Sequence, residues 1–214
     1  LHISDLHNKS FGRKQARLIK LTKAINPDII VITGDLISRN THNFVSSLTY
    51  LEAAVKIAPV YYVSGNHENG NLLFADLVIE LEALGVNILD NRNSQWVINN
   101  RMINIIGVND FSFFNDIEVM KDIINELKKA DQYNILLSHR PELLEMYSQT
   151  DVELVLAGHA HGGQVRLPLI GGLIAPDQGL FPKYTQGVYN LNNTQMLVSR
   201  GLGNSIIPVR VFNR

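Results

Sequence analysis

The chain has 214 residues, of which 45% are hydrophobic and 18% charged, and its formal net charge is -1. This composition is typical of a globular protein with a sizeable core. The near-neutral charge, with no Lys/Arg cluster, gives no electrostatic support for nucleic acid binding. The absence of cysteine excludes disulfides and thiolate metal ligands, and no apolar run reaches the length of a transmembrane helix.

Strand-like and helix-like patterns alternate through the first half of the chain. Continuous apolar, often β-branched runs predict strands that are covered on both faces, and apolar residues at helical spacing predict helices. The predicted strands are 1–4, 29–33, 60–63 and 86–89. The predicted helices are 13–25, 43–58 and 72–84. This alternation predicts an α/β fold built in layers.

The second half of the chain is richer in predicted strands, which indicates a second sheet. Its predicted elements are a hairpin of 96–99 and 102–108, helices 116–130 and 141–147, and strands 134–138, 153–157, 187–191, 195–199 and 206–212. The stretch 167–186 is rich in Gly and Pro and has little regular period. We expect it to be a long loop, which in a compact domain is usually functional or disordered.

Side chains suited to metal binding follow five of the predicted strands. They are Asp5 and His7, Asp35, Asn66 and His67, His139, and His159 and His161. Taken singly, each has a simpler explanation as a turn former, a helix cap or a solvated loop residue. Because the carboxyl ends of parallel strands meet at one edge of a sheet, the recurrence at five strand ends favours one common site.

Imidazole, carboxylate and amide groups without sulfur suit manganese, iron or zinc better than calcium or magnesium. A carboxylate such as that of Asp35 has two oxygens and can bridge two cations. Two metal ions can activate a water molecule and hold both oxygens of an in-line displacement, which is what phosphate ester hydrolysis needs. His67 need not be a ligand, because an imidazole beside the phosphate can donate a proton to the leaving oxygen or stabilise charge.

Five short blocks together resemble the signature of the calcineurin-like metallophosphoesterases. In order, they are Asp5-Leu6-His7, Gly34-Asp35, Gly65-Asn66-His67-Glu68, the lone His139 and Gly158-His159-Ala160-His161. The resemblance implies a four-layer α/β/β/α sandwich with two mixed central sheets and a dimetal site at its edge. Ser38 departs from the family pattern, which often has an acidic residue at this position; the position is not that of a metal ligand.

The same resemblance implies a ligand set and a mechanism. One divalent metal ion would be held by Asp5, His7, Asp35 and His161. The second would be held by Asp35, Asn66, His139 and His159. A hydroxide between the two metals would attack the phosphorus atom, and His67 would act on the leaving group.

The segments 161–168 and 174–179 resemble a bacterial subgroup, the YkuE/YaeI-type phosphoesterases. Many of these have an N-terminal membrane anchor or export signal, and some relatives cleave the pyrophosphate of UDP-diacylglucosamine. The resemblance implies a bacterial, membrane-associated or exported protein whose single catalytic domain spans 1–214. Its substrate would be a phosphate monoester, diester or pyrophosphate, including a nucleotide-sugar or lipid-linked one. Since Leu1 is not a start methionine, we expect a targeting or anchoring segment upstream of it.

Several roles stay open at the level of sequence. The apolar residues of 167–181 either meet a lipid chain or membrane surface, or pack under their own loop. Arg166, Lys183 and Arg200 are candidates for binding the substrate phosphate, although surface solvation is the simpler role for each. Two alternative functions are a nuclease of the same fold, which the charge disfavours, and a non-catalytic interaction module, which the full set of expected ligand types disfavours.

Overall fold

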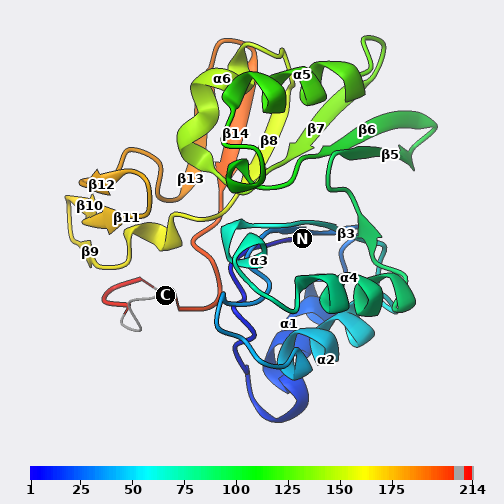
Figure 1. Cartoon of the computed structure of the whole chain (residues 1–214), viewed down its shortest axis with the longest axis vertical. Helices are drawn as coiled ribbons and strands as arrows, with labels where there is room; N and C mark the ends of the chain where they lie inside the picture. Colours follow the sequence, from blue (N-terminus) through cyan, green and yellow to red (C-terminus); the bar gives the residue numbers. More distant parts are fainter. Residues whose placement is uncertain (205–209, 214) are drawn as a thin grey trace.

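The computed structural model describes residues 1–204 and 210–213, which form two packed sheets with helices outside them (Figure 1). The first sheet has the strand order β1-β2-β3-β4 and is parallel throughout. Its strands are β1 (His2–Ile3), β2 (Ile30–Thr33), β3 (Val60–Val63) and β4 (Asn87–Ile88). Each of the three connections between its strands contains a helix, as the alternating pattern predicts.

The second sheet has six strands in the order β13-β14-β8-β7-β6-β5 and is mixed. The four inner strands run parallel, and the two edge strands pair antiparallel with their neighbours. Its strands are β5 (Arg92–Ile98), β6 (Arg101–Gly107), β7 (Tyr133–Leu137), β8 (Leu154–Ala157), β13 (Gly187–Leu191) and β14 (Thr194–Val198). The two sheets therefore come from consecutive halves of the chain.

Helices cover the outer face of each sheet. They are α1 (Ala16–Ile25), α2 (Val45–Ala54), α4 (Phe74–Ala83), α5 (Ile117–Leu127) and α6 (Leu144–Ser148), whereas the short α3 (Asn66–Asn69) lies in the turn region after β3. Short 3-10 turns add η1 (Arg13–Gln15), η2 (Phe111–Phe113), η3 (Pro141–Leu143) and η4 (His161–Gly163). In Figure 1, α1, α2 and α4 lie under the first sheet, and α5 and α6 lie over the second.

Three hydrophobic cores show how these layers are held together. One lies between the first sheet and its helices and includes Ile32 and Tyr50, and another lies between the second sheet and its helices and includes Ile124 and Val155. The third lies between the sheets, where Val31 and Tyr61 pack in one cluster with Ile105, Ile135 and Leu137. Burial of this apolar surface is the main favourable term in folding. The predicted α/β/β/α architecture is confirmed.

Local sequence signals explain where individual helices begin and end. The carboxylate of Asp116 caps α5 by accepting the backbone N–H of Glu118 at 3.0 Å. The stripe that includes Met120 and Ile124 is buried against the second sheet, which is why this amphipathic segment folds there. At the other end of the chain, α1 stops at Asn26, whose φ of 49° is left-handed, and Pro27 follows.

The structure differs from the sequence-based expectation in the stretch 167–186. The expected irregular loop is wrong there, because four strands of two residues form two small antiparallel ladders. They are β9 (Arg166–Leu167) with β10 (Gly171–Gly172), and β11 (Ile174–Ala175) with β12 (Gly179–Leu180). Two residues are too few to produce a recognisable alternation. Of the predicted strand 206–212, residues 206–209 lie outside the described residues, while Val211 makes an isolated parallel bridge to Val165.

Candidate metal centre

The predicted ligands follow the carboxyl ends of strands from both sheets. Their turns have unusual backbone geometry, because most of these non-glycine residues have positive φ. The values are 53° for Asp5, 50° for His7, 52° for Asp35, 64° for His159 and 47° for His161. Such conformations cost about 1–3 kcal/mol each and cluster at functional sites. Five of the twenty non-glycine residues with positive φ in the described part of the chain are thus predicted ligands.

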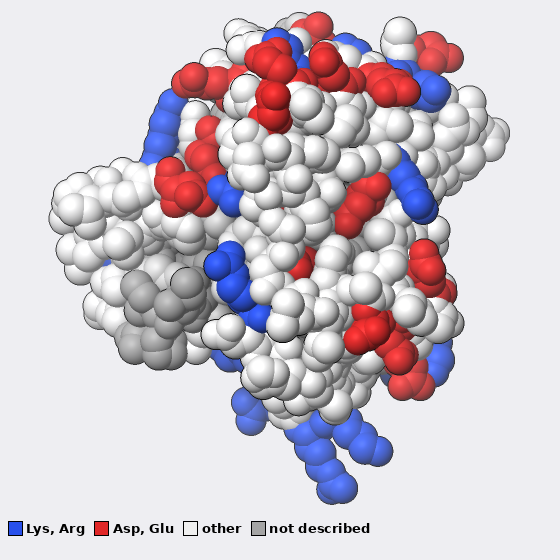
Figure 2. All heavy atoms as spheres, in the orientation of Figure 1, with Lys and Arg blue, Asp and Glu red and all other residues white. Residues whose placement is uncertain are grey.

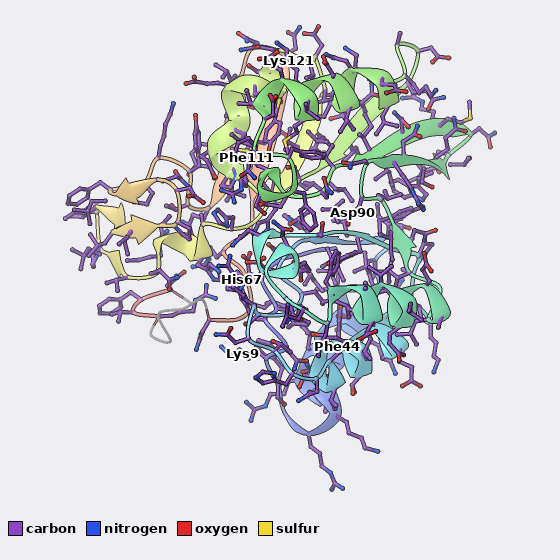
Figure 3. The ribbon with its side chains drawn as sticks, viewed as in Figure 1. Lys9, Phe44, His67, Asp90, Phe111 and Lys121 are labelled. Atoms are coloured by element: carbon purple, nitrogen blue, oxygen red, sulfur yellow. The ribbon has the colours of Figure 1, made fainter. Side chains whose placement is uncertain are left out.

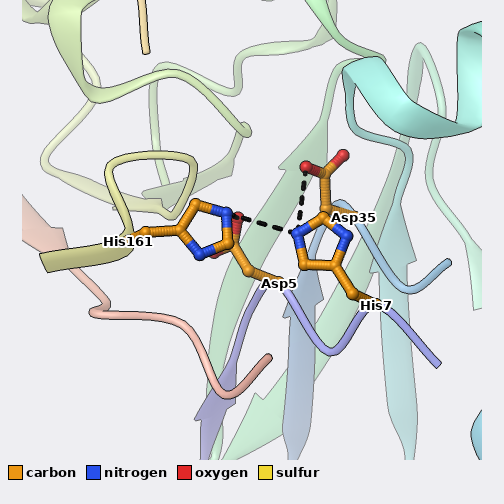
Figure 4. A group of neighbouring side chains, drawn as sticks. All are labelled: Asp5, His7, Asp35 and His161. Atoms are coloured by element: carbon orange, nitrogen blue, oxygen red, sulfur yellow. Dashed lines mark hydrogen bonds and ion pairs between the residues drawn. The ribbon is translucent and has the colours of Figure 1, made fainter. Parts of the chain in front are cut away.

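The first group of predicted ligands comprises Asp5, His7, Asp35 and His161, all buried and with potential ligand atoms within 4.8 Å of one another (Figure 4). His7 Nε2 lies 3.2 Å from His161 Nε2 and 3.6 Å from Asp35 Oδ2. His161 Nε2 also lies 3.3 Å from Asp5 Oδ1. Two imidazoles and two carboxylates thus surround one point beyond the carboxyl ends of the strands.

The second group comprises Asp35, His139 and His159, which are also buried. His139 Nε2 lies 3.4 Å from Asp35 Oδ2 and 3.1 Å from His159 Nδ1. The half-buried Asn66 adds an amide oxygen, 3.2 Å from the same His139 nitrogen. The structure therefore brings together all seven predicted ligands, in two adjacent groups.

Asp35 belongs to both groups through a single oxygen. Its Oδ1 accepts the backbone N–H of His67 at 2.9 Å, which holds the carboxylate in place. Its Oδ2 faces Nε2 of His7, His139 and His67 at 3.6, 3.4 and 3.9 Å. Burial raises the pKa of Asp35, but the charge of His139 and its hydrogen bond outweigh this and hold that pKa well below the usual range. Oδ2 is thus an ionised oxygen available to two cations.

The donor set fits divalent metal ions on geometric grounds. At a metal–nitrogen distance of about 2.0–2.1 Å, two ligand nitrogens on one ion lie roughly 3.0–3.4 Å apart. The nitrogen pairs of His7 with His161 and of His139 with His159 are 3.2 and 3.1 Å apart. Moreover, neither Asp5 nor Asp35 forms an ion pair with Lys or Arg among residues 1–204 and 210–213. Buried carboxylates require a cationic partner.

The second nitrogen of most of these imidazoles is held by a hydrogen bond. His139 Nδ1 donates to the carbonyl of Thr33 at 2.8 Å, and His7 Nδ1 lies 3.1 Å from Ser38 Oγ. Ser38, which departs from the family pattern, therefore orients a predicted ligand. His159 Nε2 lies 2.9 Å from Asp177 Oδ2. A hydrogen bond on the far nitrogen fixes the tautomer that leaves the near nitrogen free to bind metal.

Glu68 organises the backbone of two ligand turns, a role that sequence reasoning missed. Its carboxylate accepts the backbone N–H groups of Asp35 at 2.9 Å, Ile37 at 3.0 Å and Gly65 at 2.7 Å. Burial and the charge of Asp35 raise the pKa of Glu68 to about 8, although the N–H donors of Ile37 and Gly65 act in the opposite direction. Its place three residues after Gly65, as in a capping box, is the available sequence signal.

His67 lies at the start of α3, between the two halves of the molecule (Figure 3). Its Nδ1 accepts the backbone N–H of Arg39 at 3.0 Å. The ring hydrogen must then be on Nε2, which faces the metal groups 3.9 Å from Asp35 Oδ2. Burial lowers the pKa of His67, so the neutral imidazole donates through Nε2–H.

A small cavity of about 90 Å³ opens at these groups. It is lined by Asp35, Asn66, His67, His159, His161, Pro176 and Asp177. A larger open hollow of about 900 Å³ lies at the β5–β6 hairpin and is lined by none of the predicted ligands, so size alone does not locate the site.

The three cations predicted to bind substrate phosphate do not line the small cavity. Arg166 Nη1 donates to the carbonyl of Gly162 at 2.7 Å. Lys183 is exposed, with its Nζ 4.9 Å from the centre of the Tyr184 ring, and Arg200 is exposed. Their role in substrate binding stays a prediction.

The cavity wall adds Asp177, to which sequence reasoning assigned no function. It is the single acidic residue in 163–214, and this isolation is the signal that the sequence offered. Its carboxylate also meets the guanidinium of Arg140, at 2.5 Å from Nη1. The hydrogen bond from His159 and the charge of Arg140 outweigh burial and lower the pKa of Asp177 to about 2, so the side chain is ionised at neutral pH.

Within residues 1–204 and 210–213, no helix combines the length and the apolar character needed to cross a membrane.

Comparisons with known proteins agree with this geometry. The family model described as "Calcineurin-like phosphoesterase" matches residues 1–163. The metallophosphoesterase YkoQ of Bacillus subtilis is 29% identical over 220 residues, which cover 100% of this chain and 79% of YkoQ. Phosphodiesterase YaeI of Escherichia coli is 26% identical over 211 residues, covering 95% of this chain and 74% of YaeI. The crystal structure of TT1561 from Thermus thermophilus shares the fold, with a TM-score of 0.65 at 13% identity, over 94% of this chain and 88% of that one.

Proposed function

This chain belongs to the calcineurin-like phosphoesterase family and is a hydrolase of phosphoester bonds, and we propose that it acts through two divalent transition-metal ions. One ion would be held by Asp5, His7, Asp35 and His161. The other would be held by Asp35, Asn66, His139 and His159. The observation that carries this proposal is the position of Asp35 Oδ2, which faces histidines of both groups at 3.4–3.6 Å. Four imidazoles with carboxylate and amide oxygens favour manganese, iron or zinc.

When bound, the two metal ions would lower the pKa of a water molecule that serves as the nucleophile and would neutralise charge on the phosphate. The protein's own groups perform the remaining tasks. Asp35 keeps its bridging oxygen in place because the His67 amide holds the other oxygen. His67 presents Nε2–H to the cavity, since its Nδ1 is occupied by the Arg39 amide. We assign to it the hydrogen bond, and then the proton, that the leaving oxygen requires.

For the substrate, we propose a phosphate diester or pyrophosphate, with a monoester as the alternative. The relative named phosphodiesterase YaeI supports the diester. The cavity beside His67 is small, at about 90 Å³, so it would take the phosphate while the rest of the substrate lies on the outer surface. Residues 1–214 would act as one catalytic domain, because both sheets contribute ligands.

We extend this proposal to a substrate in, or attached to, an anionic lipid membrane. The β9–β12 segment and the nearby chain end carry strongly exposed apolar side chains. Their exposed fractions are 108% for Leu169, 60% for Ile170, 71% for Leu180, 67% for Phe181 and 74% for Phe212. These five side chains therefore do not pack under their own loop. The side chain of Leu173, in the same segment, is half-buried. Exposed apolar patches of this kind mark interaction sites.

The distribution of charged residues also supports membrane binding by this surface. Residues 163–214 contain five Lys or Arg and one Asp, although the whole chain has a net charge of -1. The lobe that carries β9–β12 projects from the body and is almost free of charged atoms on the face shown in Figure 2. Lys183, two residues after Phe181, is exposed. An apolar projection with flanking cations matches the interface of an anionic bilayer.

The function is tested by stripping the full chain of metal and restoring manganese, iron or zinc. Substrates would be p-nitrophenyl phosphate, bis-p-nitrophenyl phosphate and a UDP-linked lipid. We expect two ions per chain and turnover that depends on them. Asp35→Asn should reduce metal occupancy and nearly abolish turnover. Two bound ions without turnover on any substrate would favour a non-catalytic module, and full activity of Asp35→Asn would overturn the bridging role.

The lipid extension is tested separately, by co-sedimentation with vesicles that contain or lack anionic lipid. Leu169→Asp/Phe181→Asp should reduce pelleting with the anionic vesicles. The matched control is Val97→Asp/Met102→Asp, which places the same charges on exposed apolar residues of the β5–β6 hairpin. Equal pelleting of wild type and Leu169→Asp/Phe181→Asp would contradict the membrane surface and would leave the hydrolase proposal intact.

A further inference from the structure

The two ring nitrogens of His159 face different partners. Nδ1 lies 3.1 Å from His139 Nε2, in the second metal group, and Nε2 lies 2.9 Å from Asp177 Oδ2. A metal-binding nitrogen must be free of its hydrogen, so the hydrogen of a neutral His159 is on Nε2 and is donated to Asp177. Asp177 comes from the turn between β11 and β12, beyond the residues 1–163 that the family model matches.

We propose that Asp177 is a positioning residue of the metal centre, which orients His159 and strengthens its binding to the second metal ion. This inference rests on the proposed role of His159 as a ligand. A carboxylate that accepts the outer N–H of a ligand imidazole fixes the ring and its tautomer and makes the inner nitrogen more basic. The sequence offers no other acidic side chain in 163–214 for this task.

Asp177 is itself held in place by Arg140. The side chain of Asp177 is 52% exposed, so it needs an anchor if it is to define a ring orientation. Arg140 Nη1 lies 2.5 Å from Asp177 Oδ2. The same guanidinium makes a two-pronged contact with Asp110, from Nε to Oδ2 at 2.8 Å and from Nη2 to Oδ1 at 3.0 Å. Such planar, bidentate pairs are among the strongest and most directional in proteins.

Asp110, which holds the guanidinium of Arg140, is fully buried. Its Oδ1 also accepts the backbone N–H of Ser112 at 2.8 Å. Arg140 directly follows the ligand His139 in the sequence. The hydrogen bonds therefore connect a buried carboxylate, through Arg140 and Asp177, to His159. The surface segment 174–180 thereby becomes part of the support of the metal centre.

The contacts of Glu142 argue against a third metal site formed by Glu142, His159 and Asp177. Donor atoms of Glu142, His159 and Asp177 lie within 4.8 Å of one another. However, the Arg140 guanidinium stands between the carboxylates, with Nη1 3.4 Å from Glu142 Oε1 and 2.5 Å from Asp177 Oδ2. The positive charge that these carboxylates need is already present. Glu142 makes no hydrogen bond to His159 among the described contacts, which makes it a suitable control.

The test compares Asp177→Ala, Asp177→Asn and Glu142→Gln in the full chain. Zinc affinity would be measured by competition with a chromophoric chelator that resolves two binding steps. For Asp177→Ala we expect the second step to weaken about 10–100-fold while the first is retained. Asp177→Asn should show a smaller loss, because its amide oxygen still accepts the N–H, and Glu142→Gln should match wild type.

A second measurement excludes a merely structural role. In zinc-loaded wild type, the His159 Nε2–H proton should be visible by NMR and protected from solvent exchange, and Asp177→Ala should lose this protection. Unchanged second-step affinity together with an unchanged proton signal would overturn the inference. Equal weakening of both steps would also overturn it, because that result indicates general loosening of the site. Wild type that binds fewer than two zinc ions would instead overturn the dimetal assignment on which the inference rests.

Discussion

Glu68 accepts the backbone N–H of Asp35 at 2.9 Å, although 33 residues separate them in the chain. The same carboxylate accepts the N–H groups of Ile37 and Gly65, so one side chain fixes the turns after β2 and β3 relative to each other. These turns carry the predicted bridging ligand Asp35 and the predicted ligand Asn66. The relative position of ligands from neighbouring strands thus depends on a residue that need not touch a metal ion.

We predict that Glu68→Ala destabilises the protein by about 3 kcal/mol or more, because three buried N–H groups lose their acceptor. Glu68→Gln should cost less, since one amide oxygen still accepts. Urea unfolding of the metal-free variants measures this change, with Glu80→Ala on the exposed side of α4 as control. We expect the control to lose no more than about 0.5 kcal/mol of stability. An equally small loss for Glu68→Ala would contradict the role of Glu68 in holding the two turns together.

Replacement of His67 should separate metal binding from turnover. Because the Nε2–H of His67 faces the cavity and His67 is not among the proposed ligands, we predict that His67→Ala keeps the metal content of wild type and loses about 10²–10⁴-fold in kcat. Metal content by elemental analysis and kcat on a diester measure the two effects. His42→Ala removes an exposed histidine and is the matched control. Loss of metal together with activity would show that His67 is a ligand instead.

Gly65→Ala tests how closely the ligand turns approach one another. A Cβ at Gly65 would collide with the Asp35 side chain and its backbone nitrogen, and neither can move without shifting a ligand. We expect a loss of about 1–3 kcal/mol in stability and a reduced metal stoichiometry. Gly70→Ala, at the other end of α3, meets only the flexible side chain of Arg39 and should be tolerated. Equal behaviour of both variants would rule out the steric argument.

Asp90 should make stability depend on pH outside the metal centre. It lies beyond β4, accepts the backbone N–H of Ser64 at 2.8 Å, and burial raises its pKa from 3.8 to about 6 (Figure 3). Between these values the unfolded chain ionises Asp90 while the folded protein keeps it protonated. The stability contributed by Asp90 is therefore present below pH 4, falls as the pH rises towards 6, and is constant above.

Asp90→Asn removes this titration and keeps an acceptor for Ser64. Relative to wild type, the variant should gain about 1–2 kcal/mol at pH 8 and less at pH 4. Urea unfolding of the metal-free proteins at both pH values measures the difference, with Asp76→Asn on the exposed face of α4 as control. A stability difference that does not change with pH would count against the raised pKa.

Much of the site was predictable because its chemistry restricts the residue types. A carboxylate or imidazole directly after a buried strand contrasts with its neighbours, so Asp35 and His139 stand out in the sequence without any knowledge of the fold. The architecture was predictable for a related reason, since continuous apolar runs such as 60–63 can be strands covered on both sides. Here the observed strand β3 has the predicted bounds.

The remaining features depend on contacts for which the local sequence offers only weak signals, namely the spacing of Glu68 after Gly65 and the isolation of Asp177. Glu68 and Asp177 act on residues 33 and 18 positions away, and their side chains look like ordinary turn or surface residues in the sequence. The small ladders of β9–β12 escaped prediction because each strand has two residues. What the sequence predicted was the presence of functional groups, and what it missed was the network that orients them.

The division of the ligands between the sheets also constrains how the protein is made. Asp5, His7, Asp35 and Asn66 follow strands of the first sheet, and His139, His159 and His161 follow strands of the second. Chains fold from the N-terminus as they leave the ribosome. A nascent chain with only the first sheet would therefore hold both carboxylates and Asn66 but only one of the four histidines; His159 completes the second proposed metal group and His161 the first. Both proposed metal groups would therefore be complete only after β8 and the turn that follows it have been made.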